Sequence, residues 1–316
     1  MGRRPSDSSS ATTIMESLGG GGPQSLWGAR LRAPALHAGL AAGVGEDLPA
    51  ACAAQIRDVL GASDAGLLMH SQQRTLRAWQ LFEEDCLRTQ VWRAQPAELV
   101  VLVQMLRPPW DTLPPEFQAA RAHHIGVNPQ RPPLDLLGCM RAAVDRNGGL
   151  LSVEPFTHAL APPASETLEA FAELCDVLSP NDLEARSMLG PVAAEAPPLE
   201  LAKRLLDAGA ARVTLRRGAE GALVASARKG EAWHVPAAQD VSVVDTTGCG
   251  NAFCGAFVTA LQAGDGLAAA GAWGCVAASF MAEARGMPRE PPGQPQIQAL
   301  AAQRLERVLA ATVQLA

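Results

Sequence analysis

From about residue 120 to the end of the chain, short apolar runs alternate with segments in which apolar residues recur every three or four positions. The runs 122–127 and 149–156 have the length of buried strands, and 134–144 between them has helical spacing. Further helices are expected at 165–175, 182–190, 198–210, 251–264, 265–286 and 296–314. Further strands are expected at 176–181, 211–218, 221–227 and 241–248. This alternation predicts an α/β fold in which helices cover both faces of a parallel sheet.

The first third of the chain has a different pattern. Residues 75–93 alternate apolar and polar positions on both sides of an acidic turn, E-E-D, which is typical of a hairpin exposed on one face. We therefore expect a small β flap at about 74–95, outside the main sheet. Residues 99–117 form a strand or a helix interrupted by prolines. The serine-rich start predicts a disordered tail over 1–17, which leaves one domain over 18–316.

Composition and charge narrow the choice of partners. The 316 residues include 26 basic and 32 acidic side chains, a formal net charge of −6 without a basic stripe, so nucleic acid is not an expected partner. No run of 18 apolar residues occurs, so no membrane span is expected. Seven cysteines without a C-x-x-C pair indicate reduced thiols and disfavour structural zinc. We expect a cytoplasmic protein, and Arg3 and Arg4 leave an organellar transit segment open.

The stretch D-T-T-G-C-G-N, residues 245–251, places small residues directly before an apolar helix. The amides at such a helix start point outward and carry the positive end of the helix dipole, so Gly248, Cys249 and Gly250 form a candidate anion site. A tight turn with close helix packing explains the same glycines equally well. The two interpretations stay open at this point.

Three blocks in a fixed order make the pattern more specific: D-T-T-G-x-G-x-A-F-x-G-A-F from residue 245, S-P-N-D-L-E-A at 179–185 and T-L-R-R-G-A-E-G-A-L-V at 214–224. Together they resemble the signatures of the PfkB, or ribokinase-like, carbohydrate kinase family. The resemblance covers 120–316 well and 19–95 loosely. With A-W-Q-L-F-E-E-D and S-V-E-P-F-T, the G-x-G-N order is similar to a divergent branch that includes the fungal maintenance-of-killer type.

The resemblance implies a ribokinase-like fold, with a doubly wound, mostly parallel sheet and a small β lid. It also implies transfer of a phosphoryl group from ATP, with Mg²⁺, to a hydroxyl of a sugar or sugar-like metabolite, and a homodimer formed through the flap. By position, the resemblance implies an anion hole at Gly248, Cys249 and Gly250 and a nucleotide site at Arg216, Gly218, Gly221 and Ala278. It implies that Asn181 and Glu184 hold Mg²⁺ through water. It also implies a monovalent cation such as K⁺ at Asp245 and Thr247. From the residues alone, Asn181 and Glu184 equally fit the cap and first turn of a helix.

Two departures from the family pattern separate two functional hypotheses. The family's catalytic base is the aspartate after G-x-G, and here that position is Asn251, a neutral amide that cannot accept the hydroxyl proton. The G-G-x-x-x-N block is matched by G-G-G-G-P-Q without its asparagine, and no first strand with an acidic substrate residue precedes it, so the substrate residues are unknown. A slow kinase and an inactive pseudokinase that serves as a nucleotide-binding or scaffold module both remain open.

Other polar residues in strands have weaker signals. His123 and His124 are adjacent in an expected strand, so their side chains point to opposite faces and cannot share one metal there. Glu154 precedes Pro155 at a strand end; we interpret the pair as a strand-end turn, and contact with water at a phosphate site is the alternative. Cys249 is interpreted as a small residue in place of the family's usual alanine, and a thiol whose pKa is lowered beside the anion site is the alternative.

Overall fold

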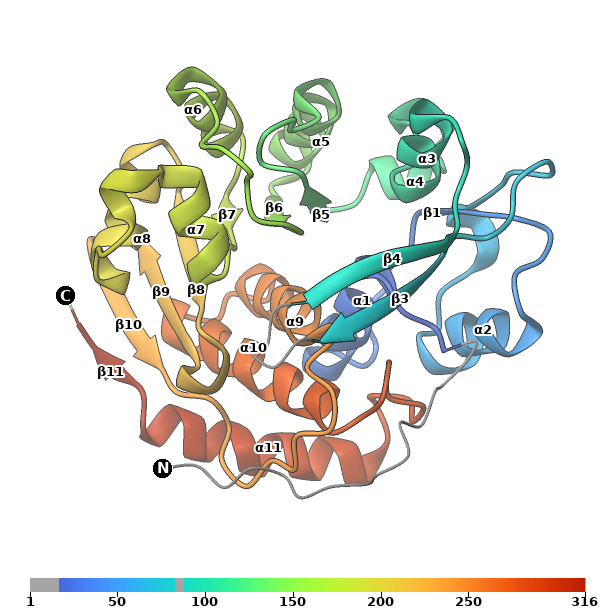
Figure 1. Cartoon of the computed structure of the whole chain (residues 1–316). Helices are drawn as coiled ribbons and strands as arrows, with labels where there is room; N and C mark the ends of the chain where they lie inside the picture. Colours follow the sequence, from blue (N-terminus) through green and yellow to red (C-terminus); the bar gives the residue numbers. More distant parts are fainter. Residues whose placement is uncertain (1–16, 83–87, 316) are drawn as a thin grey trace, which may run out of the picture.

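A seven-stranded sheet organises the computed structural model, which describes residues 17–82 and 88–315 (Figure 1). Its strand order is β11-β10-β9-β8-β7-β6-β5. The parallel strands are β5 (Ala122–Val127), β6 (Leu150–Pro155), β7 (Val177–Leu178) and β8 (Arg212–Arg216). The antiparallel strands that follow are β9 (Ala222–Ser226), β10 (Glu231–Val235) and β11 (Val313–Gln314). The expected α/β fold is confirmed.

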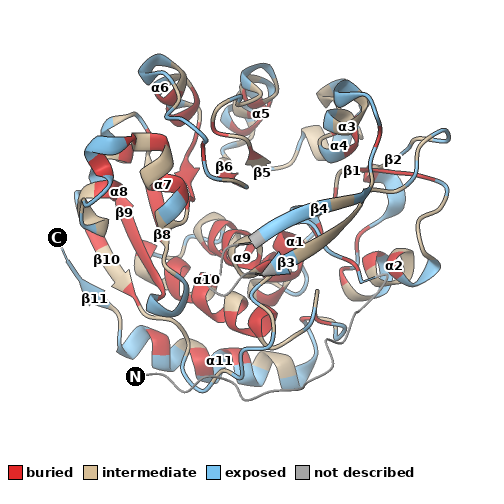
Figure 2. Cartoon of the chain, viewed as in Figure 1, coloured by how far each residue is buried: buried red, intermediate tan, exposed pale blue. Residues whose placement is uncertain are grey.

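Helices cover both faces of this sheet. One face packs against α5 (Leu134–Asn147), α6 (Ser165–Glu173), α7 (Asp182–Leu189) and α8 (Pro198–Asp207). The other packs against α1 (Gly21–Arg32), α9 (Cys249–Gln262), α10 (Leu267–Ala282) and α11 (Pro295–Ala310). Buried residues line the sides of these helices that face the strands (Figure 2). Within the described ranges no helix has both the length and the apolar character needed to cross a bilayer.

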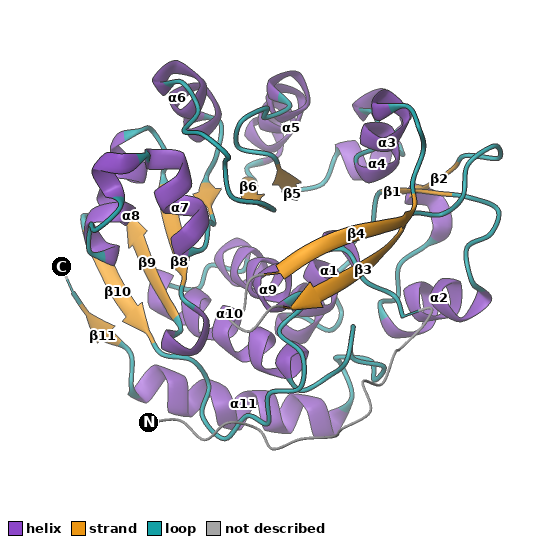
Figure 3. Ribbon diagram, viewed as in Figure 1, coloured by secondary structure: helices purple, strands orange, loops and turns teal. Residues whose placement is uncertain are grey.

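The N-terminal third forms small elements beside the main sheet (Figure 3). Strands β1 (Ala42–Val44) and β2 (Leu67–Met69) are parallel, and β3 (Arg77–Phe82) and β4 (Arg88–Ala94) form the expected antiparallel hairpin. The helical elements here are α2 (Ala50–Ala54) with a π-turn (Gln55–Val59), 3₁₀ turns (Asp64–Gly66 and Trp110–Thr112), α3 (Leu99–Leu106) and α4 (Pro115–Gln118). Part of the tail, 1–16, and the acidic turn, 83–87, lie outside the described residues. The domain bounds and the role of the hairpin as a flap stay predictions.

The expected strand 241–248 is wrong. These residues form a loop, and Val243 and Val244 are 63% and 48% exposed. The amide of Val244 donates to the carbonyl of Ala282 at the end of α10, 2.8 Å away, rather than to a strand. A valine-rich run reports a preference for extended backbone, but a strand also needs a neighbour to pair with. The edge beyond β9 is taken by β10 and β11.

Candidate active site

Helix α9 opens at a glycine that bends the chain. Gly248 caps the helix with φ +87°, a left-handed conformation that favours glycine, and the helix starts at Cys249. The preceding loop is held by its own contacts, since Oδ1 of Asp245 accepts from the amide of Thr247 at 2.8 Å. The amides of Gly250 and Asn251 lie in the first turn, where a helix offers no acceptor and carries a positive partial charge. The amide of Cys249, which was expected among the donors, instead donates to the carbonyl of Thr246 at 3.3 Å, so the opening offers the amides of Gly250 and Asn251 to an anion.

Helix α1 packs along α9 and brings Gln24 to this opening. Gln24 is 1% exposed, and its side chain occupies the space that a Cβ atom on Gly248 would need. Its Oε1 accepts from Nδ2 of Asn251 at 2.7 Å, and its Nε2 donates to the carbonyl of Thr247 at 3.5 Å. Asn251 is thus held in one orientation by a residue 227 positions earlier in the chain.

Sequence reasoning missed Gln24. Counted from Gly19, it stands where the G-G-x-x-x-N block has its asparagine, so a longer amide replaces a shorter one at that position. The block lacks its asparagine, but the position still carries a side-chain amide. The count of residues after the glycines was the signal that could have found it.

Arg216, at the end of β8, lies against the first turn of α9. Its Nη1 occupies the position that a Cβ atom on Gly250 would need, and its side chain is 14% exposed. Nη2 donates to the carbonyl of Ser179 at 2.7 Å and to Oε2 of Glu184 at 3.2 Å. Nη1 lies 3.4 Å from Oε2 of Glu154, and Nε is buried without a hydrogen-bond partner in the described part of the chain. A buried cation therefore stands beside the positive end of a helix, balanced by two carboxylates.

Asn181 and Glu184 form a capping box at the start of α7. Oδ1 of Asn181 accepts from the amide of Glu184 at 2.8 Å, and the amide of Asn181 donates to Oε2 of Glu184 at 2.7 Å. The structural role that the sequence left open is therefore present. The same Oε2 also accepts from Arg216, so one carboxylate oxygen serves the cap and the ion pair together.

Glu154 is a buried acid close to the helix opening. It is 3% exposed, and burial acts to raise its pKa, but the neighbouring His124 and the charge of Arg216 outweigh this and lower the pKa of Glu154. Glu154 and Pro155 stand at a strand end as expected, but both still belong to β6 rather than to a turn, and the glutamate is buried in the interior.

The model of the pfkB family carbohydrate kinases matches residues 110–291, more than half of the chain and the blocks at 179–185, 214–224 and 245–257. The chain belongs to the PfkB family of carbohydrate kinases. One curated relative, an uncharacterized protein of Schizosaccharomyces pombe, is 30% identical over 158 residues. That match covers 43% of this chain and 43% of the relative, so the chain spans less than half of the relative's length.

Solved structures of related kinases share this PfkB fold. A Burkholderia thailandensis nucleoside kinase in complex with ADP-inosine superposes with a TM-score of 0.70 at 17% identity, covering 96% of this chain and 86% of its own. An Arabidopsis thaliana ribokinase complexed with ribose and ATP gives 0.65 at 18% identity, covering 90% and 86%. A Thermotoga maritima ribokinase gives 0.63 at 21% identity, covering 92% and 87%. The ribokinase-like fold is therefore shown.

Some of the remaining residues with roles implied by the PfkB family lie beside the opening of α9, and others do not. Gly218 and Gly221 bound the short turn Gly218–Glu220 directly after β8, next to Arg216. Ala278, on α10, is half-buried and packs against the core rather than into the cluster just described. Burial, together with the charge of Asp245, raises the pKa of Cys249 to about 12, so its thiol is protonated at neutral pH. This agrees with its interpretation as a small residue and not with the alternative of a lowered pKa.

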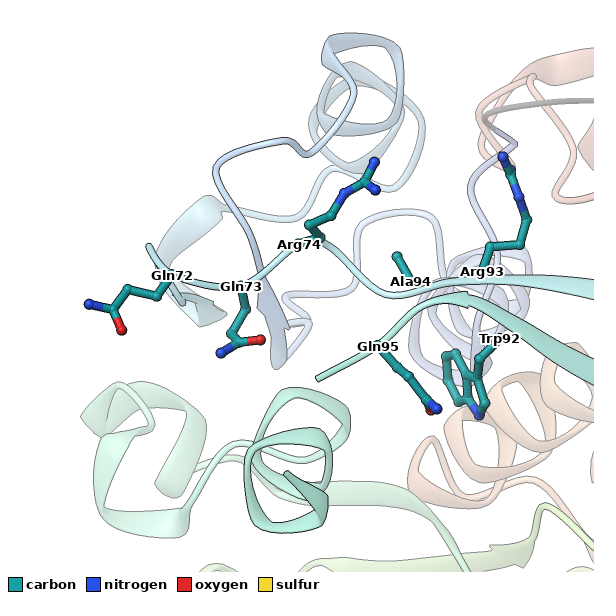
Figure 4. Close-up of a pocket in the computed structure, with 7 residues that line it drawn as sticks. All are labelled: Gln72, Gln73, Arg74, Trp92, Arg93, Ala94 and Gln95. Carbon is teal, nitrogen blue, oxygen red and sulfur yellow. The ribbon is translucent and has the colours of Figure 1, made fainter. Parts of the chain in front are cut away.

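A separate cavity lies at the base of the β3–β4 hairpin (Figure 4). It has a volume of about 360 Å³ and is lined by Gln72, Gln73, Arg74, Trp92, Arg93, Ala94 and Gln95. The side chains in Figure 4 spread in different directions and do not converge on one point. The base of the hairpin is fixed by Asp47, which pairs with Arg74 at 3.2 Å and Arg77 at 3.0 Å. None of the residues lining this cavity belongs to the corner at α9.

Proposed function

We propose that this PfkB-family chain is a slow phosphotransferase, which transfers the terminal phosphoryl group of ATP to a hydroxyl of a sugar or sugar-like metabolite. The observation that carries the proposal is the convergence of donors at the opening of α9. The amides of Gly250 and Asn251 have no helical acceptor, and the buried Nε of Arg216 has no partner among the described residues. Such donors stabilise the charge on phosphoryl oxygens, which is the main contribution of a protein to phosphoryl transfer.

The cofactors fit this corner in part. Bound Mg²⁺ would neutralise charge on the nucleotide phosphates. The side-chain oxygens of Asn181 and Glu184 are of the kind that Mg²⁺ prefers. Because Oε2 of Glu184 already accepts from Arg216, we assign these residues contacts to the ion through water. A monovalent cation at Asp245 and Thr247 stays a prediction, supported by the hydroxyl of Thr247, which is buried without a hydrogen-bond partner in the described chain.

Asn251 orients the acceptor rather than ionising it. Its Nδ2 donates to Gln24, which leaves its Oδ1 close to Gly21. An amide oxygen accepts a hydrogen bond from a hydroxyl but does not take up its proton, so the proton passes to water or to the phosphoryl group itself. The missing general base lowers the rate by about 10²–10⁴-fold. Positioning and charge stabilisation are retained.

One observation favours the alternative, a pseudokinase that binds nucleotide as a scaffold. Arg216 and Glu184 are paired with each other, and Gln24 covers Gly248, so side chains of the protein itself fill part of the corner. A nucleotide would have to displace some of these contacts, and a family member that no longer turns over could keep them. The two functions predict different results for an acid at position 251: it should raise the turnover of a slow kinase and produce no turnover in a pseudokinase.

The relatives indicate which substrates to test. The Arabidopsis protein was solved with ribose and ATP, and the Burkholderia protein with inosine, so the panel begins with ribose, related sugars and nucleosides. Membership of the G-x-G-N branch rests on the sequence, and the match to a fungal protein supports it. A cytoplasmic location and a homodimer through the β3–β4 hairpin remain predictions; the exposed Leu81 and Val91 on the hairpin support the second.

The test is ADP formation from ATP and Mg²⁺ with each substrate, for the wild type and for Asn251→Asp. We expect slow turnover of at least one substrate and an increase of about 10²–10⁴-fold in kcat with the aspartate. The matched control is Asn147→Asp, the same change at the end of α5, which should leave the rate unchanged. Nucleotide binding measured by calorimetry without turnover in either protein would favour the pseudokinase. No nucleotide binding would remove both functions.

A further inference from the structure

Three metal-ligating side chains meet beneath the opening of α9: His124 on β5, Glu154 on β6 and Cys254 on α9. One donor atom from each lies within 4.8 Å of the other two. Nε2 of His124 is 3.5 Å from Oε1 of Glu154, and Sγ of Cys254 is 3.3 Å from Oε2 of the same carboxylate. Glu154 and Cys254 are buried, and His124 is nearly so.

Strand alternation explains how these residues come together. In the parallel pair β5–β6, His124 lies opposite Ser152, and Glu154 follows two residues later on the same face. That face looks toward α9, where Cys254 stands three residues after Asn251 and therefore on the same side of the helix. His123 points the other way, and its ring packs against Trp110. Only one of the two adjacent histidines can join the cluster.

Each of the three groups also has a partner that orients it. Nδ1 of His124 lies 3.0 Å from Oγ of Ser152, and donation to this hydroxyl leaves Nε2 with its lone pair toward the cluster. This Nε2 is buried and has no hydrogen-bond partner in the described residues. Arg216 holds the second oxygen of Glu154, and Oγ of Ser179 lies 3.2 Å from the sulfur of Cys254. Ligands supported in this way by a second layer are characteristic of protein metal centres.

We propose that His124, Glu154 and Cys254 bind one Zn²⁺ ion, with a fourth position left to water. An imidazole, a carboxylate and a thiolate are zinc ligands, and three protein ligands with an open position are a known zinc arrangement. With metal–ligand bonds of about 2.0–2.3 Å, the donor atoms need only a small inward shift to reach tetrahedral spacing. The inference does not depend on phosphoryl transfer, because it concerns binding of the ion alone.

Charge balance supports a divalent ion. With the thiol protonated and the imidazole of His124 neutral, as its lone pair at Nε2 requires, the carboxylates of Glu154 and Glu184 face one guanidinium, Arg216, which leaves one net negative charge in a buried place. On binding, the thiol of Cys254 forms a bond to the metal and releases its proton to solvent. The divalent ion and the new thiolate together add one positive charge, and the cluster becomes neutral. Glu154 serves both cations, with Oε1 toward the metal and Oε2 toward Arg216.

The experiment is a titration of metal-free full-length protein with Co²⁺, followed by competition with Zn²⁺. We expect one ion per chain, the near-ultraviolet absorption of a thiolate–cobalt bond and the visible bands of a tetrahedral ion, all displaced by Zn²⁺. Cys254→Ala should abolish the thiolate absorption. Cys275→Ala, at another buried cysteine, should leave it unchanged and is the matched control. Ser152→Ala should weaken Co²⁺ binding by about 10–100-fold, as for other residues that support metal ligands.

The wild-type titration decides the proposal even if a variant fails to fold. Folded wild-type protein that binds no Co²⁺ or Zn²⁺ at one equivalent overturns it and leaves a hydrogen-bonded polar cluster. Thiolate absorption that survives in folded Cys254→Ala also overturns it, since another cysteine would then be the ligand.

Discussion

On strands β6 and β8 the two faces of the central sheet differ in chemistry, although the same strands make both. On β6, Leu151 and Val153 point toward α5–α8 and are completely buried in an apolar core. Ser152 and Glu154, the residues between and after them, point toward α9 and are buried as well. Alternation along a strand separates the two sets, and burial does not distinguish them.

Strand β8 repeats the contrast. Val213 and Leu215 belong to the apolar core, whereas Thr214 and Arg216 face α9. The apolar face is stabilised by removing hydrocarbon from water. The polar face is tolerated because its groups are paired, and such pairing at best compensates the cost of burial. A polar layer of this kind adds little to stability, and its position under α9 agrees with the site proposed there.

The largest loss of stability is expected when Arg216, the cation of the polar face, is replaced. Arg216→Met leaves Glu154 and Glu184 buried without their shared partner, and we expect it to lower the free energy of unfolding by about 3–5 kcal/mol. Urea denaturation measures the loss. The matched control is Arg204→Met, which breaks an exposed pair with Glu200 and should cost about 0–1 kcal/mol. Equal losses in the two variants would mean that breaking the network around Arg216 costs no more free energy of unfolding than breaking a surface pair.

The apolar face should respond to lost volume instead. Leu215→Ala opens a cavity at a completely buried position, and we expect a loss of about 2–5 kcal/mol in the same urea measurement. Leu183→Ala, on α7 and 47% exposed, should change the free energy of unfolding by about 0.5 kcal/mol or less. A loss at Leu215 no larger than at Leu183 would contradict the assignment of this face as the core.

The capping box at the border of the polar face should have a smaller effect. Asn181→Ala removes the acceptor for the amide of Glu184, and we expect a loss of about 0.5–2 kcal/mol. Asn181→Ser, a substitution that retains a capping oxygen, should restore most of it. If serine and alanine are equally destabilising, the cap is not the reason that asparagine matters at this position.

The smallest effect is expected from a charge outside both faces. The amide of Thr75, followed by the side chains of Arg74 and Thr75 and the charge of Arg77, lowers the pKa of Asp47 to about 2 despite some opposing burial. A carboxyl whose pKa is lowered by folding stabilises the protein above its unfolded pKa of about 4, and this stability is lost as the pH falls toward about 2. Asp47→Asn should therefore flatten the pH dependence of the urea midpoint between about pH 4 and 2. An unchanged slope would show that Asp47 does not contribute to it.

Much of this architecture was accessible from local patterns. The strands β5 and β6 and the helices α5 and α8 lie where apolar periodicity placed them, because burial on one or both sides leaves a direct trace in the sequence. The loop at 241–248 was mispredicted, because its valines have the propensity of a strand but no neighbouring strand. Family blocks identified Asn181, Glu184 and Arg216, but not the fact that the last two pair with each other.

The sequence by itself determined the fold class, the PfkB membership and the absence of an acid at position 251. Each of these can be recognised from short segments in which neighbouring residues form the pattern. Only the tertiary structure decided that Gln24 holds Asn251, that Arg216 lies against Gly250 and that His124 meets Glu154 and Cys254. The physical reason is that a strand shows which side chains share a face, while the packing of α1 and α9 on that face selects which of them meet.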